Sequence, residues 1–322
     1  MEAFFQQTRA RALLSALLGQ GRIGNALLFL GPAGAGQEEG AKALMMAANC
    51  PFPGSARDGG GLGDVFGDLS PCGRCPSCRR ILGGNHPDYL VVRREGAFVK
   101  KGAVKDLLAM LALKPGEGRL RLAVIPEAAR MNKEAANALL KSLEEPPAQT
   151  AFVLVAEGAA DLLPTLVSRC RPVRFAPLAP GVVESFLTRE KKAASEAAGI
   201  CAKLSGGSLP RAAELLESGA WRRSRFFEER LSELLDGRAG DPLLRALLLS
   251  ELMARSGKES AAESLDMIRG LLRCRLSDAG GKAARSACCA GLSAVESARR
   301  DLAGNVSPRL AMDGFFFSLL KN

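Results

Sequence analysis

The strongest chemical signal in the sequence is a group of four cysteines. Cys72, Cys75 and Cys78 stand at C-x2-C-x2-C spacing, and Cys50 supplies a fourth thiol. Thiols at this spacing suit adjacent corners of a metal tetrahedron, and four thiols without an open position favour a closed, structural zinc site. An iron–sulfur cluster of the ferredoxin type begins with the same spacing. It continues with another Cys before Pro, whereas this sequence has Leu82 there.

The fourth corner of the zinc site has two candidates. We rank Cys50 ahead of His86, because a lone His before Pro87 is more often a loop residue. The Gly-rich segment 53–70 separates Cys50 from the other thiols and is expected to form a flexible surface loop. Because the entropy of loop closure grows slowly with length, this separation still permits coordination. Nine cysteines without a secretion signal favour metal binding over disulfides.

A second motif has the frame of a phosphate-binding P-loop but not its chemistry. Gly31, Gly34 and Gly36 follow an apolar run and precede an Ala-rich helix, in the spacing G-x-x-x-x-G-K-[ST]. Gln37 and Glu38 replace the lysine that neutralises phosphate and the hydroxyl that holds magnesium. The carboxylate of Glu38 instead places negative charge at the helix N-terminus, where a phosphate would bind. The loop alone is equally compatible with an ordinary glycine-rich turn.

The strand that normally supplies a magnesium ligand and a water-polarising base is also altered. The best candidate ends in Pro126-Glu127, so Pro126 replaces the aspartate that holds the metal. Glu127 is retained, but without metal or phosphate we expect it only to cap the following turn. The lysine, the hydroxyl and the aspartate are all absent, which predicts that this chain neither binds nor hydrolyses ATP.

The elements that must position these motifs alternate in the first half of the chain. Short apolar runs separated by helical patterns predict a parallel sheet covered by helices, an α/β domain. The segment Asn132 to Glu145 reads as an amphipathic helix that ends at Pro146-Pro147. The five expected strands are Ala26 to Leu30, Tyr89 to Arg93, Leu120 to Ile125, Ala151 to Ala156, and Pro172 to Phe175.

Beyond about residue 177 the sequence reads as helices only. We expect an α/β domain at 1–177 that includes a zinc module at 50–78, a small helical lid domain at 178–209, and a helical bundle at 210–322. Two short helices are expected in the lid, around Gly181 to Arg189 and Lys191 to Leu204.

Composition narrows the class of protein. The chain has 322 residues, 47% of them hydrophobic and 24% charged, and no apolar run approaches the roughly 18 residues of a membrane span. We therefore expect a cytoplasmic protein. The net charge of +10 favours acidic partners such as DNA, although a solvated basic surface explains it equally well. The 5% aromatic content argues against a platform on which single-stranded bases stack.

Together these motifs resemble one family, the delta prime subunits of the bacterial DNA polymerase III clamp loader, which are AAA+ relatives of the gamma/tau subunit. The resemblance rests on the defective P-loop and the cysteine cluster. It also rests on Asn85 to Asp88 before a strand, the run NALLKSLEEPP from Asn137 to Pro147, and Ser168-Arg169-Cys170. It covers residues 25–178 well, while the last hundred residues agree only in their helical character.

The resemblance implies a division of labour in a hetero-oligomer. In this family the arginine of the Ser168-Arg169-Cys170 motif acts in trans on ATP bound by a gamma/tau neighbour. A guanidinium is a rigid, permanently charged donor suited to that role. Arg171 and Arg174 are alternative fingers nearby. Arg211 occupies the start of the sensor-2 helix and is expected to be structural.

The resemblance further implies partners and a place in replication. The partners would be gamma/tau and delta subunits, with the sliding clamp and primed DNA contacted through the complex. The chain would then be a non-hydrolysing part of the DNA polymerase III holoenzyme, a DNA-directed DNA polymerase, and its C-terminal helices would join the collar. Two other functions stay open at this stage: an active P-loop NTPase, and a zinc-dependent nucleic-acid-binding protein.

Overall fold

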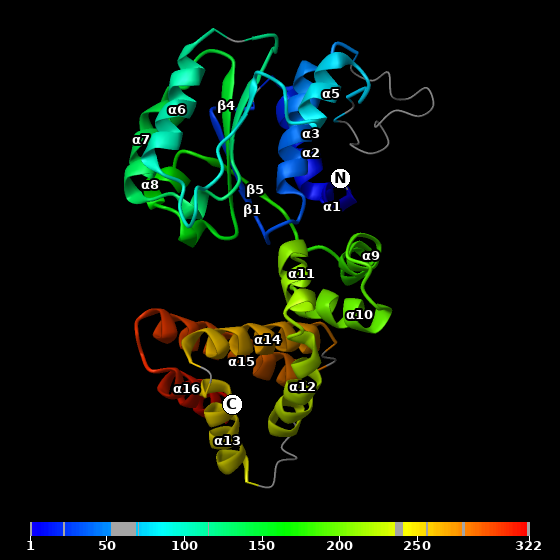
Figure 1. Cartoon of the computed structure of the whole chain (residues 1–322), viewed down its shortest axis with the longest axis vertical. Coiled ribbons are helices and arrows are strands. Elements are labelled where there is room, and N and C mark those ends of the chain that lie inside the picture. The colour runs from blue at the N-terminus through cyan, green and yellow to red at the C-terminus, as the bar shows by residue number, and fades with distance from the viewer. Residues whose placement is uncertain are drawn as a thin grey trace. The chain divides into compact units, whose positions relative to one another are not determined.

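The computed structural model divides into two compact units, Met1–Leu178 and Ala179–Asn322. It describes residues 2–21, 23–52, 69, 71–114, 116–235, 241–255, 257–278 and 281–320. The Gly-rich segment expected to form a surface loop therefore lies outside the described residues, apart from Leu69. Figure 1 shows a sheet with helices on both sides in the first unit, and helices in the second.

The first unit is built on a parallel five-stranded sheet in the order β2-β3-β4-β1-β5. The central strands β1, β3 and β4 are buried along their whole length, which explains why they read as continuous apolar runs. β5 lies at an edge and buries only Val173 of its four residues. The strands are β1 (Ala26–Leu30), β2 (Tyr89–Val91), β3 (Arg121–Ile125), β4 (Thr150–Ala156) and β5 (Arg171–Arg174).

Helices cover both faces of this sheet (Figure 1). α6, α7 and α8 pack over one face through an apolar cluster that includes Leu107, Leu139 and Leu166. α1, α2, α3 and α5 lie on the other side. Their bounds are α1 (Glu2–Phe5), α2 (Thr8–Gly19), α3 (Gln37–Asn49), α5 (Pro76–Leu82), α6 (Lys101–Ala112), α7 (Lys133–Glu144) and α8 (Pro164–Val167), with short 3-10 turns η2 (Ala128–Arg130) and η3 (Ala159–Asp161).

The second unit is helical throughout its described residues. α9 packs against α10 and α11, and α10 also contacts α12 and α14. α13, α14, α15 and α16 pack against one another. The helices are α9 (Pro180–Glu190), α10 (Ser195–Leu204), α11 (Leu209–Glu217), α12 (Trp221–Leu235), α13 (Pro242–Ala254), α14 (Lys258–Asp278), α15 (Lys282–Ala303) and α16 (Pro308–Leu320). In the described part of the chain, no helix has the length and hydropathy needed to cross a membrane.

The predicted fold class, α/β followed by all-α, is confirmed. β1 has the predicted limits, and the limits of the other four strands shift by one or two residues, because the apolar run and the ladder of hydrogen bonds do not end together. α10 begins at Ser195 and not near Lys191, since the chain adopts a left-handed conformation at Lys192, with φ of 53°. α7 matches its prediction closely: the Asn132 side chain caps it by accepting a bond from the Ala135 N–H. The finer division of the second unit near residue 209 stays a prediction.

Candidate functional site

The P-loop frame lies between the carboxyl end of β1 and the start of α3, and its backbone requires two of its glycines. Gly36 caps α3 with φ of 100°, and a Cβ there would lie 2.6 Å from the Phe4 backbone nitrogen. A Cβ at Gly31 would lie 2.4 Å from the Phe175 carbonyl oxygen. Both glycines are therefore fixed by close approach of this chain's own backbone, from α1 and from the end of β5.

The residue in the place of the P-loop lysine turns back onto the loop. Gln37 is 3% exposed, and its side-chain amide donates to the Pro32 carbonyl at 2.8 Å. A second glutamine holds the loop from outside: Gln7 donates to the carbonyls of Ala35 (2.9 Å) and Ala176 (2.8 Å) and accepts from the Ala176 N–H. The loop is thus closed by neutral hydrogen bonds within the chain.

Charged groups pair with one another at the carboxyl edge of the sheet, the edge at which the parallel strands end and the P-loop frame lies. Glu38 binds Arg93 in a two-point contact of 2.6 and 3.4 Å, and this hydrogen bonding raises the pKa of Arg93. Glu127 binds Arg94 at 3.0 Å and makes no side-chain bond to the turn that follows it, so the expected capping role is wrong. Sequence patterns do not predict Arg93 and Arg94 as partners, because each lies in an irregular segment far from its carboxylate in the sequence, 55 positions from Glu38 and 33 from Glu127.

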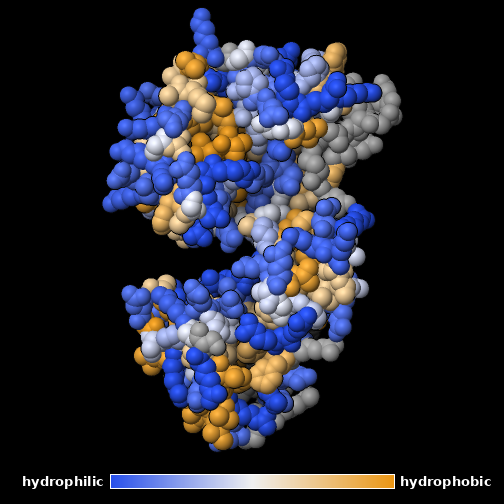
Figure 2. All heavy atoms as spheres, viewed as in Figure 1, coloured by the Kyte–Doolittle hydropathy of each residue, from blue (hydrophilic) through white to orange (hydrophobic). Residues whose placement is uncertain are grey.

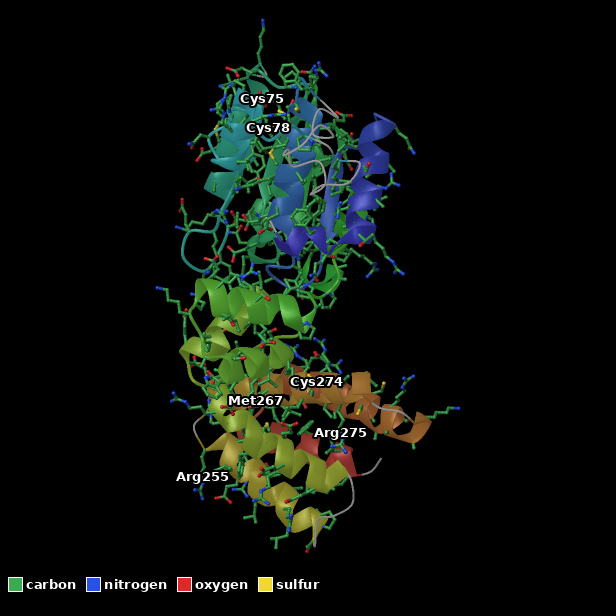
Figure 3. The ribbon with its side chains drawn as sticks, turned by 90° about the vertical axis from the view of Figure 1, so that its right-hand side faces the viewer. Cys75, Cys78, Arg255, Met267, Cys274 and Arg275 are labelled. Carbon is green, nitrogen blue, oxygen red and sulfur yellow. The ribbon has the colours of Figure 1, made fainter. Side chains whose placement is uncertain are left out.

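The four predicted cysteines come together. Their Sγ atoms all lie within 4.8 Å of one another, and all four residues are buried. Figure 3 shows Cys75 and Cys78 side by side near one end of the first unit. Thiolates at zinc distance in a tetrahedron lie roughly 3.8 Å apart, so a small contraction would suffice to hold a metal. The cluster can therefore bind a metal ion with four sulfur ligands.

Backbone N–H groups point at the sulfurs and prepare them to carry negative charge. Cys72 donates its N–H to Cys50 Sγ and Cys75 donates to Cys72 Sγ, both at 3.3 Å, while Cys78 donates to Cys75 Sγ at 3.4 Å. Burial opposes ionisation of Cys72, but N–H donors of Arg74 and Cys75 outweigh it and lower its pKa to about 7. Burial raises the pKa of Cys50 and of Cys78. Such N–H donors are what a cluster of metal-bound thiolates needs.

His86 is not a member of this cluster. Its Nδ1 accepts the Asp88 N–H at 3.1 Å, and its Nε2 lies 3.2 Å from the Ser77 hydroxyl. Because Nδ1 is an acceptor, the proton resides on Nε2, which donates to Ser77. Burial lowers the pKa of His86, which keeps the ring neutral. The alternative in which His86 replaces Cys50 as the fourth ligand therefore does not fit this geometry.

Asp88, which precedes β2, organises the amino edge of the sheet, the edge at which the parallel strands begin. Sequence patterns identify this residue only as part of a motif. Asp88 is 1% exposed and accepts the N–H groups of Gly116, Glu117 and Gly118 at 2.7–2.9 Å. Burial alone would raise its pKa, but these three donors outweigh burial and lower it. Asp88 therefore fixes the loop that leads into β3.

Arg121, the first residue of β3, neutralises this carboxylate. Its Nε lies 3.4 Å from Asp88 Oδ1, and both side chains are buried. Its terminal nitrogens donate to the carbonyls of Met110, Leu111 and Leu113 at 2.8–3.0 Å, which satisfies the C-terminal end of α6. Sequence periodicity does not reveal such a pair, because a buried arginine reads as a solvent-facing residue.

Arg169 lies just before β5 and is 35% exposed. Its Nε donates to Glu144 Oε1 at 2.6 Å and its Nη2 lies 2.5 Å from the same oxygen, while Nη1 donates to the Thr165 carbonyl at 3.0 Å. Ser168, its neighbour in the predicted motif, lies 3.4 Å from Nη1 through its hydroxyl. Cys170 is buried, which raises its thiol pKa to about 11 and makes it a packing residue.

The register of the sheet places Arg169 and the P-loop at opposite edges. Arg171 lies beside Leu27 near the start of β1, and Arg174 lies beside Leu30 next to the P-loop. Arg171 therefore lies four residues from Gly31 along the strand direction, or roughly 13 Å at the rise of a β-strand, and Arg169 lies in the turn that precedes Arg171. Arg169 cannot reach the loop of its own chain, whereas Arg174 lies beside that loop.

Arg211 is a structural residue in its local contacts, as expected. It pairs with Asp266 of α14 at 3.1 Å, and Asp266 also lies 2.9 Å from Arg269. These ion pairs lie within the second unit, and Arg211 is in the first turn of α11, which Ser208 caps. Arg211 therefore ties α11 to α14.

Comparisons with a family model and with individual proteins point to the same family. The family model described as "DNA polymerase III, delta subunit" matches residues 6–179, which contain the P-loop frame, the cysteine cluster and Arg169. The DNA polymerase III subunit delta′ of Bacillus subtilis is 32% identical over 234 residues, covering 73% of this chain and 66% of that protein. The delta′ subunit of Pseudomonas aeruginosa is 34% identical over 178 residues, covering 55% of this chain and 50% of that protein.

The matches thus span between half and two thirds of the length of these relatives. Among solved structures, a DNA polymerase III gamma subunit-related protein from Thermotoga maritima aligns over 97% of this chain and 99% of its own. Its identity is 17% and its TM-score is 0.42.

Proposed function

The chain belongs to the family of DNA polymerase III delta prime subunits, and on that premise we propose that it acts as a non-hydrolysing clamp-loader subunit. It supports ATP-dependent loading of a sliding clamp onto primed DNA in the cytoplasm. Its partners are gamma/tau and delta subunits, and it supplies Arg169 to an ATP site on a gamma/tau neighbour.

The observation that carries this proposal is the position of Arg169 at the amino edge of the sheet. The side chain is partly exposed and lies in the turn before β5, at the opposite edge from the P-loop frame of its own chain, so a phosphate that it meets is not one held by that frame. A permanently charged guanidinium that meets a phosphoryl group in transfer stabilises the charge that develops on it. Arg169 therefore acts in trans.

The carboxyl edge supports the absence of ATP chemistry on this chain. A nucleotide would need a cation and a magnesium ligand at the loop. Gln37 is instead bonded to Pro32, and Glu38 and Glu127 are bonded to Arg93 and Arg94. The residues present do not fit ATP and magnesium, since Gln37 offers no positive charge to a phosphate and the Glu38 carboxylate in the first turn of α3 would repel one.

The cysteine cluster fits a structural zinc ion held by Cys50, Cys72, Cys75 and Cys78. Four buried thiols with no carboxylate among them leave no open position for substrate or water. When bound, zinc would supply a cross-link between the end of α3, which precedes Cys50, and the start of α5, which Cys75 caps.

One face of α13 supports the predicted role of the C-terminal helices in a collar. Leu244, Leu248 and Leu252 repeat every four residues and are all exposed, while the opposite side of α13 packs on α16. Figure 2 shows apolar side chains gathered at the end of the second unit where α13 lies. Packing of this leucine face against helices of neighbouring subunits would bury it, as a collar requires.

The experiment is reconstitution of the loader with gamma/tau and delta subunits and measurement of ATP turnover stimulated by clamp and DNA. Arg169→Ala is expected to reduce turnover at least about tenfold, since a trans-acting arginine contributes even more at a single site. Arg171→Ala is measured in parallel, because Arg171 is an exposed arginine at the same edge of the sheet and the alternative finger; the proposal expects its turnover to stay near that of wild type. If Arg169→Ala leaves turnover unchanged, the proposed role of this arginine is wrong.

A further inference from the structure

Arg169 does not extend freely into solvent but is held by a carboxylate from another element. Glu144, the last residue of α7, receives Nε of Arg169 at 2.6 Å and lies 2.5 Å from Nη2 through the same oxygen. The two residues are 25 positions apart in the chain, so the contact depends on the fold. Glu144 is itself half-exposed, at 51%.

The backbone of Glu144 is fixed where this contact needs it. Its carbonyl accepts the side-chain amide of Asn25 at 2.8 Å, and Asn25 directly precedes β1. Pro146 and Pro147 follow and prevent α7 from continuing. Asn25, Glu144 and Arg169 therefore connect the start of β1, the end of α7 and the end of α8 in one chain of hydrogen bonds.

The contacts divide the guanidinium into a held side and a free side. Nε donates to Glu144, and Nη1 donates to the Thr165 carbonyl and lies near the Ser168 hydroxyl. Within the described residues, the contact of Nη2 is with the same Glu144 oxygen that Nε uses. Because each terminal nitrogen carries two N–H groups, the outer N–H of Nη2 is left to donate to a further acceptor.

We propose that Glu144 is a positioning residue: it orients Arg169 so that its Nη2 edge points away from this chain, ready for a phosphate on a neighbouring subunit. This inference rests on the proposed function of Arg169. Holding a long side chain in one rotamer before the phosphate arrives removes the entropy cost of ordering it in the transition state. A partly exposed ion pair is weak enough to let the phosphate add to the guanidinium.

The test uses the reconstituted loader and measures single-turnover ATP hydrolysis together with ATP affinity. Glu144→Ala is expected to slow hydrolysis about tenfold without changing ATP affinity, because misplacement of a catalytic group costs rate and not ground-state binding. Glu144→Gln is expected to stay within about threefold of wild type, since its amide oxygen still accepts from Nε. Glu145→Ala removes the adjacent exposed carboxylate and is the matched control, with unchanged hydrolysis expected.

A double variant separates positioning from a general effect on structure. If Glu144 acts through Arg169, adding Glu144→Ala to Arg169→Ala causes no further loss of rate. Equal or faster hydrolysis by Glu144→Ala alone, or an additive loss in the double variant, would overturn the inference. Failure of the proposed function is distinct from this, because it appears as an unchanged rate with Arg169→Ala alone.

Discussion

The two edges of the five-stranded sheet use charge in opposite ways. At the carboxyl edge the motif residues Glu38 and Glu127 are carboxylates, and each pairs with an arginine, Glu38 with Arg93 and Glu127 with Arg94. At the amino edge Arg169 shares one carboxylate and keeps part of its guanidinium exposed. A carboxylate repels an incoming phosphate and a guanidinium attracts it, so the two edges differ in the sign of the charge that their motif residues carry.

The edges also differ in how they are braced. The amino edge carries the buried Asp88–Arg121 pair and, beyond the end of α3, the cysteine cluster. Asn49, the last residue of α3, exchanges hydrogen bonds of 3.0 Å with both backbone groups of Leu120 before β3. The carboxyl edge relies on exposed ion pairs and neutral amide bonds. The stronger bracing therefore lies at the amino edge, around β2, β3 and the end of α3, and four predictions test this contrast.

Metal removal should have the largest effect on stability, since the metal would cross-link the end of α3 to the start of α5 at the amino edge. Binding of a structural metal contributes folding free energy on the order of several kcal/mol, so a strong chelator should lower the melting temperature of the first unit by at least about 10 °C. Cys78→Ser should do the same without chelator. Cys289→Ser is the control, because Cys289 is exposed and lies outside the cluster. An unchanged melting temperature in the presence of chelator would show that no bound metal stabilises this unit.

Loss of the buried carboxylate should come next. Asp88→Ala leaves Arg121 without its charge partner and three N–H groups without an acceptor, and breaking such a buried pair costs about 3–5 kcal/mol. Urea denaturation measures the change in the free energy of unfolding. Glu117→Ala is the comparison: Glu117 forms an exposed pair with Arg80, so its loss should change the free energy of unfolding far less than the loss of Asp88. Similar costs for both variants would mean that the amino edge is not specially braced.

The same carboxylate predicts a pH dependence. Hydrogen bonding holds the pKa of Asp88 below its ordinary value of about 4. Its contribution to stability is therefore complete above about pH 4 and is lost as the pH falls through the lowered folded pKa. The free energy of unfolding of wild type should fall across this acidic range more steeply than that of Asp88→Asn. Parallel curves would contradict the assignment.

The smallest effect is expected at the carboxyl edge. Glu38→Gln breaks an ion pair whose partners are both more than 40% exposed, so the free energy of unfolding should fall by less than about 1 kcal/mol. The difference should shrink further at about 1 M salt, where exposed charges are screened. A cost of several kcal/mol that persists in salt would show that this edge is braced as strongly as the other.

Much of this contrast could be predicted from the sequence because it depends on local patterns. Apolar runs located all five strands, and C-x2-C-x2-C spacing located three of the four clustered thiols. The spacing of Gly31, Gly34 and Gly36 located the loop, and substitution at Gln37 and Glu38 already argued against a nucleotide there.

The partners of these residues could not be predicted, since each comes from a distant segment. Arg93 lies 55 positions from Glu38, and Arg94 lies 33 positions from Glu127. Glu144 was visible only as one charge in an amphipathic helix. Periodicity assigns a residue to a face of its own element, whereas these contacts depend on the register between strands and on where each helix ends.

The central claim is that this chain acts on ATP from its amino edge and not from its carboxyl edge. Single-turnover hydrolysis by the reconstituted loader tests it directly when the same chain is altered at one edge or the other. The account predicts that Arg169→Ala slows hydrolysis at least about tenfold, while the double substitution Gln37→Ala and Glu38→Ala leaves the rate unchanged. The opposite result, an unchanged rate with Arg169→Ala and a slowed rate with the P-loop double variant, would contradict it.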